Sequence, residues 1–167
     1  MELLVIRHAI AFERDRHRWA DDGARPLSPA GISRSRKAAA GLKELCGVPD
    51  RLLTSPLIRA RQTAKILTEV AAWPPAEIAP ELAPGEAAAA LLTLLAKDRS
   101  KCIAVVGHQP DLSALLAACL LRAGSALAIE MKKNAVACLS FDGKTLVGRA
   151  VLKWLATPRM LRGFRNH

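Results

Sequence analysis

The sequence is poor in aromatic residues, with three Phe, three Trp and no Tyr among its 167 residues. Proteins that bind single-stranded nucleic acid stack the bases on aromatic side chains interleaved with basic ones, and no such motif occurs here. This shortage argues against a nucleic-acid-binding module, even though the formal net charge of the chain is +10.

Long hydrophobic runs are also missing. The longest nearly uninterrupted apolar runs, residues 87–96 and 112–121, have about half of the ~20 residues that a membrane-spanning helix requires. The first residues do not fit a signal peptide either, because Glu2 and Arg7 enclose only four apolar residues. We therefore expect no membrane partner and a cytoplasmic location.

The cysteines lack the spacing of a metal site or a disulfide framework. The sequence has no CxxC pair and no histidine near a cysteine that would complete a zinc-ligand set. All four lie in apolar stretches, which predicts buried free thiols in a reducing compartment; they are Cys46, Cys102, Cys119 and Cys138.

Acidic residues are absent from residues 143–167, which contain six basic ones and leave 19 basic against 15 acidic in residues 1–142. A second basic cluster includes Arg14, Arg16 and Arg18. Such a balance indicates an anionic partner, whether nucleic acid, a membrane surface or a phosphorylated substrate. The length predicts one domain, residues 1–167, ending in a basic tail at about 157–167.

Apolar runs and helix signals alternate along the chain. We expect strands at 3–6, 52–54 and 102–106, helices at 28–46, 55–71, 84–97 and 110–122, and a hairpin of 135–141 with 145–152. Strands that alternate with helices predict a single three-layer α/β/α sandwich with a mainly parallel sheet and antiparallel pairing near one edge.

Basic side chains follow three of the expected strands. Arg7 and His8 follow the first, His108 follows 102–106, and Arg59 lies about one turn into the helix after 52–54. Ligands of open α/β sheets bind beyond the carboxyl ends of the strands, so these four side chains should meet at one edge.

Two arginines and two histidines suit a phosphoryl group. Guanidinium groups match phosphate oxygens, and a helix N-terminus adds partial positive charge. A neutral imidazole can attack phosphorus, and a second histidine can stabilise charge on the transferring oxygens. The arginines supply the neutralisation that Mg²⁺ would give, so we expect neither a metal nor a cofactor.

Each residue taken alone also has a structural explanation. The Arg7-His8 dipeptide could be structural or solvated, His108 could satisfy a strand-end carbonyl, and Arg59 could lie on the surface of an amphipathic helix. His17 fits a solvated loop. The coincidence of three independent strand ends favours the functional interpretation.

These motifs carry a resemblance. Residues 4–9 resemble the RHG or RHA opening of the histidine phosphatase superfamily, the phosphoglycerate mutase-like fold; residues 54–64 resemble its SPxxRAxQTA segment and 106–110 its GHxP segment. Further segments resemble the small SixA-type phosphohistidine phosphatases, which carry no large cap insertion. The resemblance implies that His8 is the nucleophile, that Arg7 and Arg59 clamp the phosphate, and that His108 completes the phosphate pocket.

The sequence departs from larger family members at one position. Where these usually have a proton-donating glutamate, two residues after the leucine that is Leu82 here, this chain has Pro84. The sequence assigns the donor role to none of the nearby carboxylates, each of which fits an ordinary surface acid better; they are Asp21, Asp22, Glu81 and Glu86. A phosphohistidine imidazole leaves through a weak P–N bond and can take its proton from water, so the absence favours phosphoramidates.

The sequence therefore predicts a metal-independent phosphohistidine phosphatase that acts in protein dephosphorylation and signal transduction through an intermediate on His8. Its expected partner is a phosphohistidine-bearing phosphotransfer or phosphocarrier domain, and inorganic phosphate or sulfate should also fit the site. The alternatives are a broad small-molecule phosphomonoesterase of the same fold, a polyanion-binding or nucleic-acid-binding module, and a pseudoenzyme that binds phosphorylated ligands.

Overall fold

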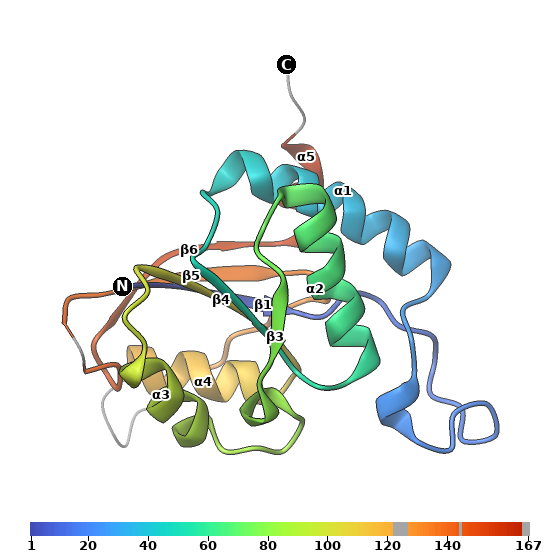
Figure 1. The fold of residues 1–167 in the computed structure, drawn as a ribbon, viewed down its shortest axis with the longest axis horizontal. Helices are drawn as coiled ribbons and strands as arrows, with labels where there is room; N and C mark the ends of the chain where they lie inside the picture. Colours follow the sequence, from blue (N-terminus) through green and yellow to red (C-terminus); the bar gives the residue numbers. More distant parts are fainter. Residues whose placement is uncertain (122–126, 144, 165–167) are drawn as a thin grey trace.

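A six-stranded sheet with helices on both faces forms the fold, seen in a computed structural model that describes residues 1–121, 127–143 and 145–164 (Figure 1). The strands are β1 (Glu2–Arg7), β2 (Arg51–Thr54), β3 (Ala76–Ile78), β4 (Cys102–Gly107), β5 (Val136–Phe141) and β6 (Ala150–Ala156). The helices are α1 (Pro29–Leu45), α2 (Ile58–Ala71), α3 (Ala88–Lys97), α4 (Asp111–Leu120) and α5 (Pro158–Gly163), with single 3₁₀ turns at Asp22–Ala24 and Pro80–Leu82.

The sheet has the order β3-β2-β4-β1-β5-β6. Strands β3, β2, β4 and β1 are parallel, whereas β5 is antiparallel to both β1 and β6. This arrangement confirms the predicted α/β sandwich with a mainly parallel sheet and antiparallel pairing at one side.

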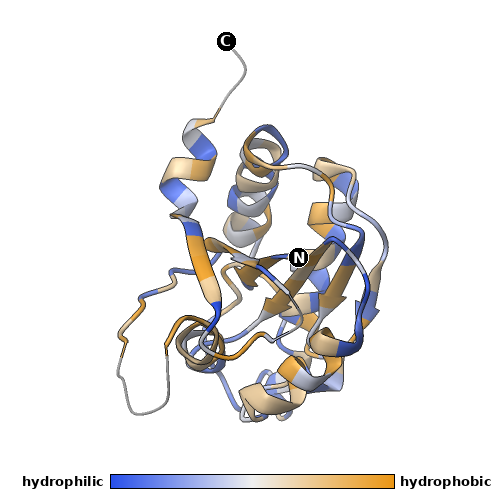
Figure 2. Ribbon diagram, turned by 90° about the vertical axis from the view of Figure 1, so that its left-hand side faces the viewer, coloured by the Kyte–Doolittle hydropathy of each residue, from blue (hydrophilic) through white to orange (hydrophobic). Residues whose placement is uncertain are grey.

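Both faces of the sheet are buried, and β1 shows why its sequence is a continuous apolar run. Leu4 and Ile6 contribute to a core under α1, α2 and α5, while Leu3 and Val5 contribute to a second core under α3 and α4. Alternate residues of a strand point to opposite faces, so a strand covered on both sides must be apolar throughout. Figure 2 shows the hydrophobic strands enclosed between the helices.

The start of α1 agrees with the sequence, because the Ser28 side chain accepts a hydrogen bond from the Gly31 N–H at 3.0 Å and Pro29 begins the helix. The predicted start of the second helix at residue 55 was wrong. Helix α2 begins at Ile58 after Leu57, whose side chain makes no capping bond, since the Ser55 hydroxyl faces His108 instead. Helix α3 also begins later than predicted, after the 3₁₀ turn at Pro80–Leu82.

Two edge strands differ from the prediction. Strand β3 was not foreseen, because its three residues are too few to give a strand signal; they form a strand by pairing with β2. The expected strand 145–152 is instead β6, Ala150–Ala156, because a longer connection holding buried Leu146 replaces the tight hairpin. The predicted end of the fourth helix at residue 122 lies outside the described residues.

The first part of the expected basic tail is an ordered helix. Thr157 caps α5 by accepting from the Met160 N–H, and Leu161, only 1% exposed, packs into the core beneath α1. The approach to α1 is close, since a Cβ on Gly41 would lie 1.7 Å from the Leu161 carbonyl oxygen. Residues 165–167 lie outside the described residues.

All four cysteines are free thiols, but only Cys119 and Cys138 are buried, whereas Cys46 and Cys102 are half-buried. Burial raises the pKa of each thiol, to about 12 for Cys119. In the described part of the chain, no helix combines the length and apolar character needed to cross a membrane.

Candidate active site

The carboxyl ends of the parallel strands β1, β4 and β2 lie side by side at the same end of the sheet. In the parallel pairing of β1 with β4, Arg7 lies opposite Gly107, and in the pairing of β2 with β4, Thr54 lies opposite Val106. The residues that directly follow β1, β4 and β2 are therefore His8, His108 and Ser55. The shared register places these side chains together, as the strand-end argument predicted.

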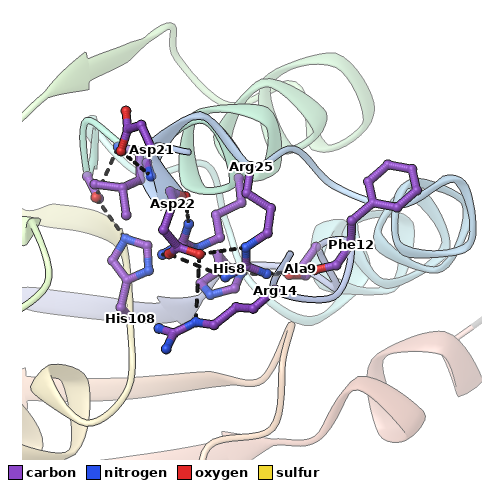
Figure 3. A network of polar contacts seen from close by, with 12 residues as sticks. His8, Ala9, Phe12, Arg14, Asp21, Asp22, Arg25 and His108 are labelled. Atoms are coloured by element: carbon purple, nitrogen blue, oxygen red, sulfur yellow. Dashed lines mark hydrogen bonds and ion pairs between the residues drawn. The ribbon is translucent and has the colours of Figure 1, made fainter. Parts of the chain in front are cut away.

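The two histidines face each other across this edge, with their ring centroids 4.9 Å apart (Figure 3). Both are almost fully buried, at 6% exposure for His8 and 3% for His108. Burial, together with the nearby His108 ring, lowers the pKa of His8 to about 3. Burial and the charge of Arg59 lower the pKa of His108 to about 4. Both rings are therefore neutral at physiological pH.

Hydrogen bonds determine which ring nitrogen of His8 is free to react. Its Nδ1 lies 2.7 Å from the Ala9 carbonyl oxygen, which can only accept, so Nδ1 carries the hydrogen. The lone pair is therefore on Nε2. The backbone beyond the ring is held by Thr63, whose hydroxyl accepts from the Ala9 N–H at 2.9 Å and donates to the Arg59 carbonyl at 2.7 Å.

Ser55 sets the state of His108 in the same way. The Ser55 hydroxyl accepts a hydrogen bond from the Leu57 N–H at 3.3 Å and lies 2.8 Å from Nε2 of His108. The hydroxyl can then donate its hydrogen to Nε2, and in that arrangement neutral His108 carries its ring hydrogen on Nδ1. The sequence analysis placed Ser55 only at the start of an expected helix and did not predict its contact with His108.

The two arginines are each anchored at one end. Nη1 of Arg7 donates to the Met131 carbonyl at 2.6 Å, and Nη1 of Arg59 donates to the Asp22 carbonyl at 2.8 Å. Among the described residues, the buried Nε groups of Arg7 and Arg59 and Nδ1 of His108 have no hydrogen-bond partner. Buried donors are normally satisfied, so three of them near His8 indicate an anion-binding site.

Asp22 is the carboxylate that touches this arrangement. Its oxygens lie 2.8 Å from Nε of Arg25, 3.2 Å from Nη2 of Arg59 and 3.6 Å from Nε of Arg14 (Figure 3). The hydrogen bond from Arg25 and the charges of Arg59 and Arg14 lower the pKa of Asp22 against the opposing effect of burial. Buried Arg25, which also donates to the Phe12 carbonyl, was not singled out by the sequence analysis.

The other three candidate acids are Asp21, Glu81 and Glu86. Asp21 is exposed, and its carboxylate accepts from the Gly23 N–H at 2.8 Å as the cap of the 3₁₀ turn. Glu81 and Glu86 line a narrow cavity together with Asp111 and His108. Within the described part of the chain, no three His, Cys, Asp or Glu side chains are placed to hold a metal ion.

Comparison with known proteins shows the family of this chain. A model described as branch 1 of the histidine phosphatase superfamily matches residues 3–84. An uncharacterized protein of Picosynechococcus is 42% identical over 116 residues, which cover 67% of this chain and 68% of the relative. Phosphohistidine phosphatase SixA of Escherichia coli K12 is 32% identical over 121 residues, which cover 70% of this chain and 73% of the relative.

A solved structure extends the likeness over nearly the whole fold. The protein histidine phosphatase SixA in complex with tungstate has a TM-score of 0.81 and 27% identity, covering 96% of this chain and 99% of that one. The sheet order, the strand-end histidines and the matched motifs agree with one assignment. The chain belongs to the histidine phosphatase superfamily and has the phosphoglycerate mutase-like fold of its small SixA-type members.

Proposed function

We propose that this chain is a metal-independent phosphatase that removes the phosphoryl group from phosphohistidine in proteins, through a covalent intermediate on His8. The observation that carries the proposal is the neutral His8 ring, with Nε2 free, beside three buried donors that have no partner among the described residues. A neutral nucleophile surrounded by donors is the arrangement that phosphoryl transfer requires.

In the first step, Nε2 of His8 attacks phosphorus and forms a new P–N bond. The P–N bond to the substrate imidazole breaks, and its electron pair leaves with that imidazole, which takes a proton. The free Nε–H groups of Arg7 and Arg59 and the Nδ1–H of His108 donate to the non-bridging oxygens, where negative charge is concentrated. The three donors are already fixed, so little reorganisation accompanies the reaction.

In the second step, water attacks the phosphoryl group on His8. The P–N bond breaks, inorganic phosphate leaves, and Nε2 recovers its lone pair. The hydrogen bond from Nδ1 to the Ala9 carbonyl keeps the ring in one orientation through both steps. Positive charge that develops on the ring while it is phosphorylated is also stabilised by that carbonyl.

The choice of a phosphoramidate follows from Pro84 and from the ionised state of Asp22. Pro84 stands where larger family members usually carry the donor glutamate, and arginines lower the pKa of Asp22, so that carboxyl is ionised at neutral pH. An alkoxide leaving group needs a positioned proton donor, whereas an imidazole can be protonated by water. The site therefore favours P–N over P–O bonds.

The comparisons support the same direction. The E. coli relative is named as a phosphohistidine phosphatase, and the SixA structure holds tungstate, an oxyanion with the tetrahedral shape of phosphate. We infer that the physiological partner is a phosphotransfer or phosphocarrier domain that presents phosphohistidine on its surface, and that the site also accepts inorganic phosphate or sulfate.

The test is release of phosphate from a phosphohistidine-labelled phosphocarrier protein. We expect rapid release by the wild type and none above background by His8→Ala. His17→Ala is the matched control, because His17 is exposed and lies outside the donor arrangement. A rapid-quench experiment with labelled phosphate should also find label on the wild-type chain that His8→Ala lacks.

Two results would contradict the proposal. Equal release by wild type and His8→Ala would exclude His8 as the nucleophile. Much faster turnover of phosphoserine peptides or sugar phosphates than of the phosphohistidine protein would instead identify a phosphomonoesterase of the same fold.

A further inference from the structure

In the segment between His8 and α1, the side chains of Phe12, Arg18 and Trp19 pack together beside the candidate active site. We call these three residues the wall. The guanidinium carbon of Arg18 lies 4.6 Å from the ring centroid of Phe12 and 4.6 Å from that of Trp19. The two aromatic rings are themselves 5.3 Å apart. A guanidinium packed on two rings holds the segment in one conformation, so this part of the chain is more than a solvated basic loop.

Backbone contacts fix the same wall at both ends. The Trp19 N–H donates to the Asp15 carbonyl at 2.8 Å, which closes a turn. Nη1 of Arg25 donates to the Phe12 carbonyl at 2.6 Å and thereby connects the wall to the buried arginine next to Asp22. The wall is thus anchored to the residues that hold Arg59 in place.

A cavity of about 750 Å³ opens between this wall and the candidate active site, and it is lined by Arg14, Asp15, Arg16, Trp19, Ala20 and Asp22. Asp22 is shared by the cavity and the site, because its carboxylate also contacts Nη2 of Arg59 at 3.2 Å. Figure 3 shows Arg14 and Asp22 beside the two histidines. A group bound in this cavity would therefore be next to the phosphorylated side chain of a substrate.

The charge that this cavity offers to a partner is positive. Its two carboxylates are already bonded within the protein, since Asp15 accepts from the backbone N–H groups of His17 and Arg18 and Asp22 accepts from Arg25. By contrast, Arg16 is exposed with no ion pair among the described residues, and the side chain of Arg14 is 82% exposed. Guanidinium groups with free donors recognise carboxylates.

A second cavity, which His108 lines, has the other sign, because Glu81, Glu86 and Asp111 also line it. An acidic partner is attracted to the Arg14 and Arg16 side and repelled from this one. A nucleic-acid backbone, with its continuous row of phosphates, would also meet the carboxylates of the cavity lined by Glu81, Glu86 and Asp111. A polypeptide can place its acidic residues on one side only, which favours a polypeptide.

We propose that the cavity bounded by Arg14, Arg16 and Trp19 is a docking subsite for an acidic segment of the phosphorylated protein, on one side of its phosphohistidine. This inference rests on the proposed phosphohistidine phosphatase activity. It adds a specificity determinant outside the phosphate-binding residues, and it assigns part of the excess positive charge to partner recognition.

The test compares two synthetic peptides of equal length, each with one central phosphohistidine, one flanked by glutamates and the other by lysines. Phosphoramidate, which is too small to reach the cavity while its phosphorus is at His8, is the reference substrate. We expect wild-type kcat/KM to be about tenfold higher for the acidic peptide at low salt, and the difference to shrink as salt is added.

The variant that tests the subsite is Arg16→Glu, and we expect it to bring the ratio of the two peptides' kcat/KM values close to one by raising KM for the acidic peptide. Arg99→Glu is the matched control, because Arg99 is also exposed and the substitution changes the charge by the same amount. Arg99 precedes β4 and therefore lies near the amino-terminal end of that strand, away from the candidate site at its carboxyl end. We expect the control to keep the wild-type preference.

The outcomes separate the subsite from the activity itself. Turnover of both peptides at equal rates by the wild type, or an equal loss of preference in Arg99→Glu, would overturn the docking subsite and leave the phosphatase in place. Failure of the wild type on every P–N substrate would overturn the proposed function. Inhibition by a single-stranded oligonucleotide at lower concentration than by an unphosphorylated acidic peptide would assign the cavity to nucleic acid and overturn the inference.

Discussion

The buried neutral histidines should make the protein unstable toward mild acid. In the unfolded chain a histidine binds a proton below its ordinary pKa of 6.5, whereas in the folded protein the pKa of His8 is lowered to about 3 and that of His108 to about 4. Between these values the unfolded state binds more protons than the folded state. The free energy of unfolding therefore rises with pH in this window and falls as the pH drops below 6.5.

The size of the effect at pH 5 depends little on how low the folded pKa values are. A pH of 5 is 1.5 units below the pKa of 6.5 of a histidine in the unfolded chain, and one unit corresponds to about 1.4 kcal/mol. Each buried ring therefore costs about 2 kcal/mol of stability at pH 5 relative to pH 8, and the two together about 4 kcal/mol. This is a large share of the ~5–15 kcal/mol that stabilises a typical domain.

The measurement is urea unfolding of wild type and His8→Asn at pH 8 and pH 5, followed by circular dichroism in phosphate-free buffer of constant ionic strength. The variant keeps His108 and should lose only about 2 kcal/mol between the two pH values, half of the wild-type loss. Other groups that titrate in this range are common to both proteins and cancel in the comparison. An equal loss in both proteins would refute the argument that burial keeps His8 neutral.

Three substitutions test other parts of the site and fold. Arg59→Lys removes the planar fork at a buried position, and kcat should fall by about 10²- to 10³-fold; activity within tenfold of wild type would exclude a role in charge stabilisation. Ser55→Ala removes the partner of Nε2 of His108, so kcat should fall by roughly tenfold with a smaller change in KM, and Ser55→Thr should recover part of it. Gly41→Ala places a methyl group against the Leu161 carbonyl, and this overpacking of backbone should cost about 3 kcal/mol; after the ~1 kcal/mol that alanine contributes to helix propensity, urea unfolding should show a net loss of about 2 kcal/mol. A Gly41→Ala protein as stable as wild type would show that α5 is not packed on α1.

The outcomes of the sequence predictions differ between the core and the edges for a physical reason. Strand β1 was predictable because a strand buried on both faces must be apolar at every position. Strand β3 was not, because three residues are too short for a strand signal; it is held by backbone pairing with β2 and by the ion pair of Glu77 with Arg51 of β2. The predicted start of α2 was wrong for a related reason, since the hydroxyl of Ser55 contacts Nε2 of His108, which follows a different strand.

The sequence by itself determined the fold class and brought forward Arg7, His8, Arg59 and His108, because strand ends and motif spacing are properties of the local chain. Only the tertiary structure decided how these side chains are held. The anchoring of Arg7 by Met131, the anchoring of Arg59 by Asp22 and the contact of Ser55 with His108 join segments far apart in the sequence. Such contacts are set by the packing of helices on the sheet, which no local pattern records.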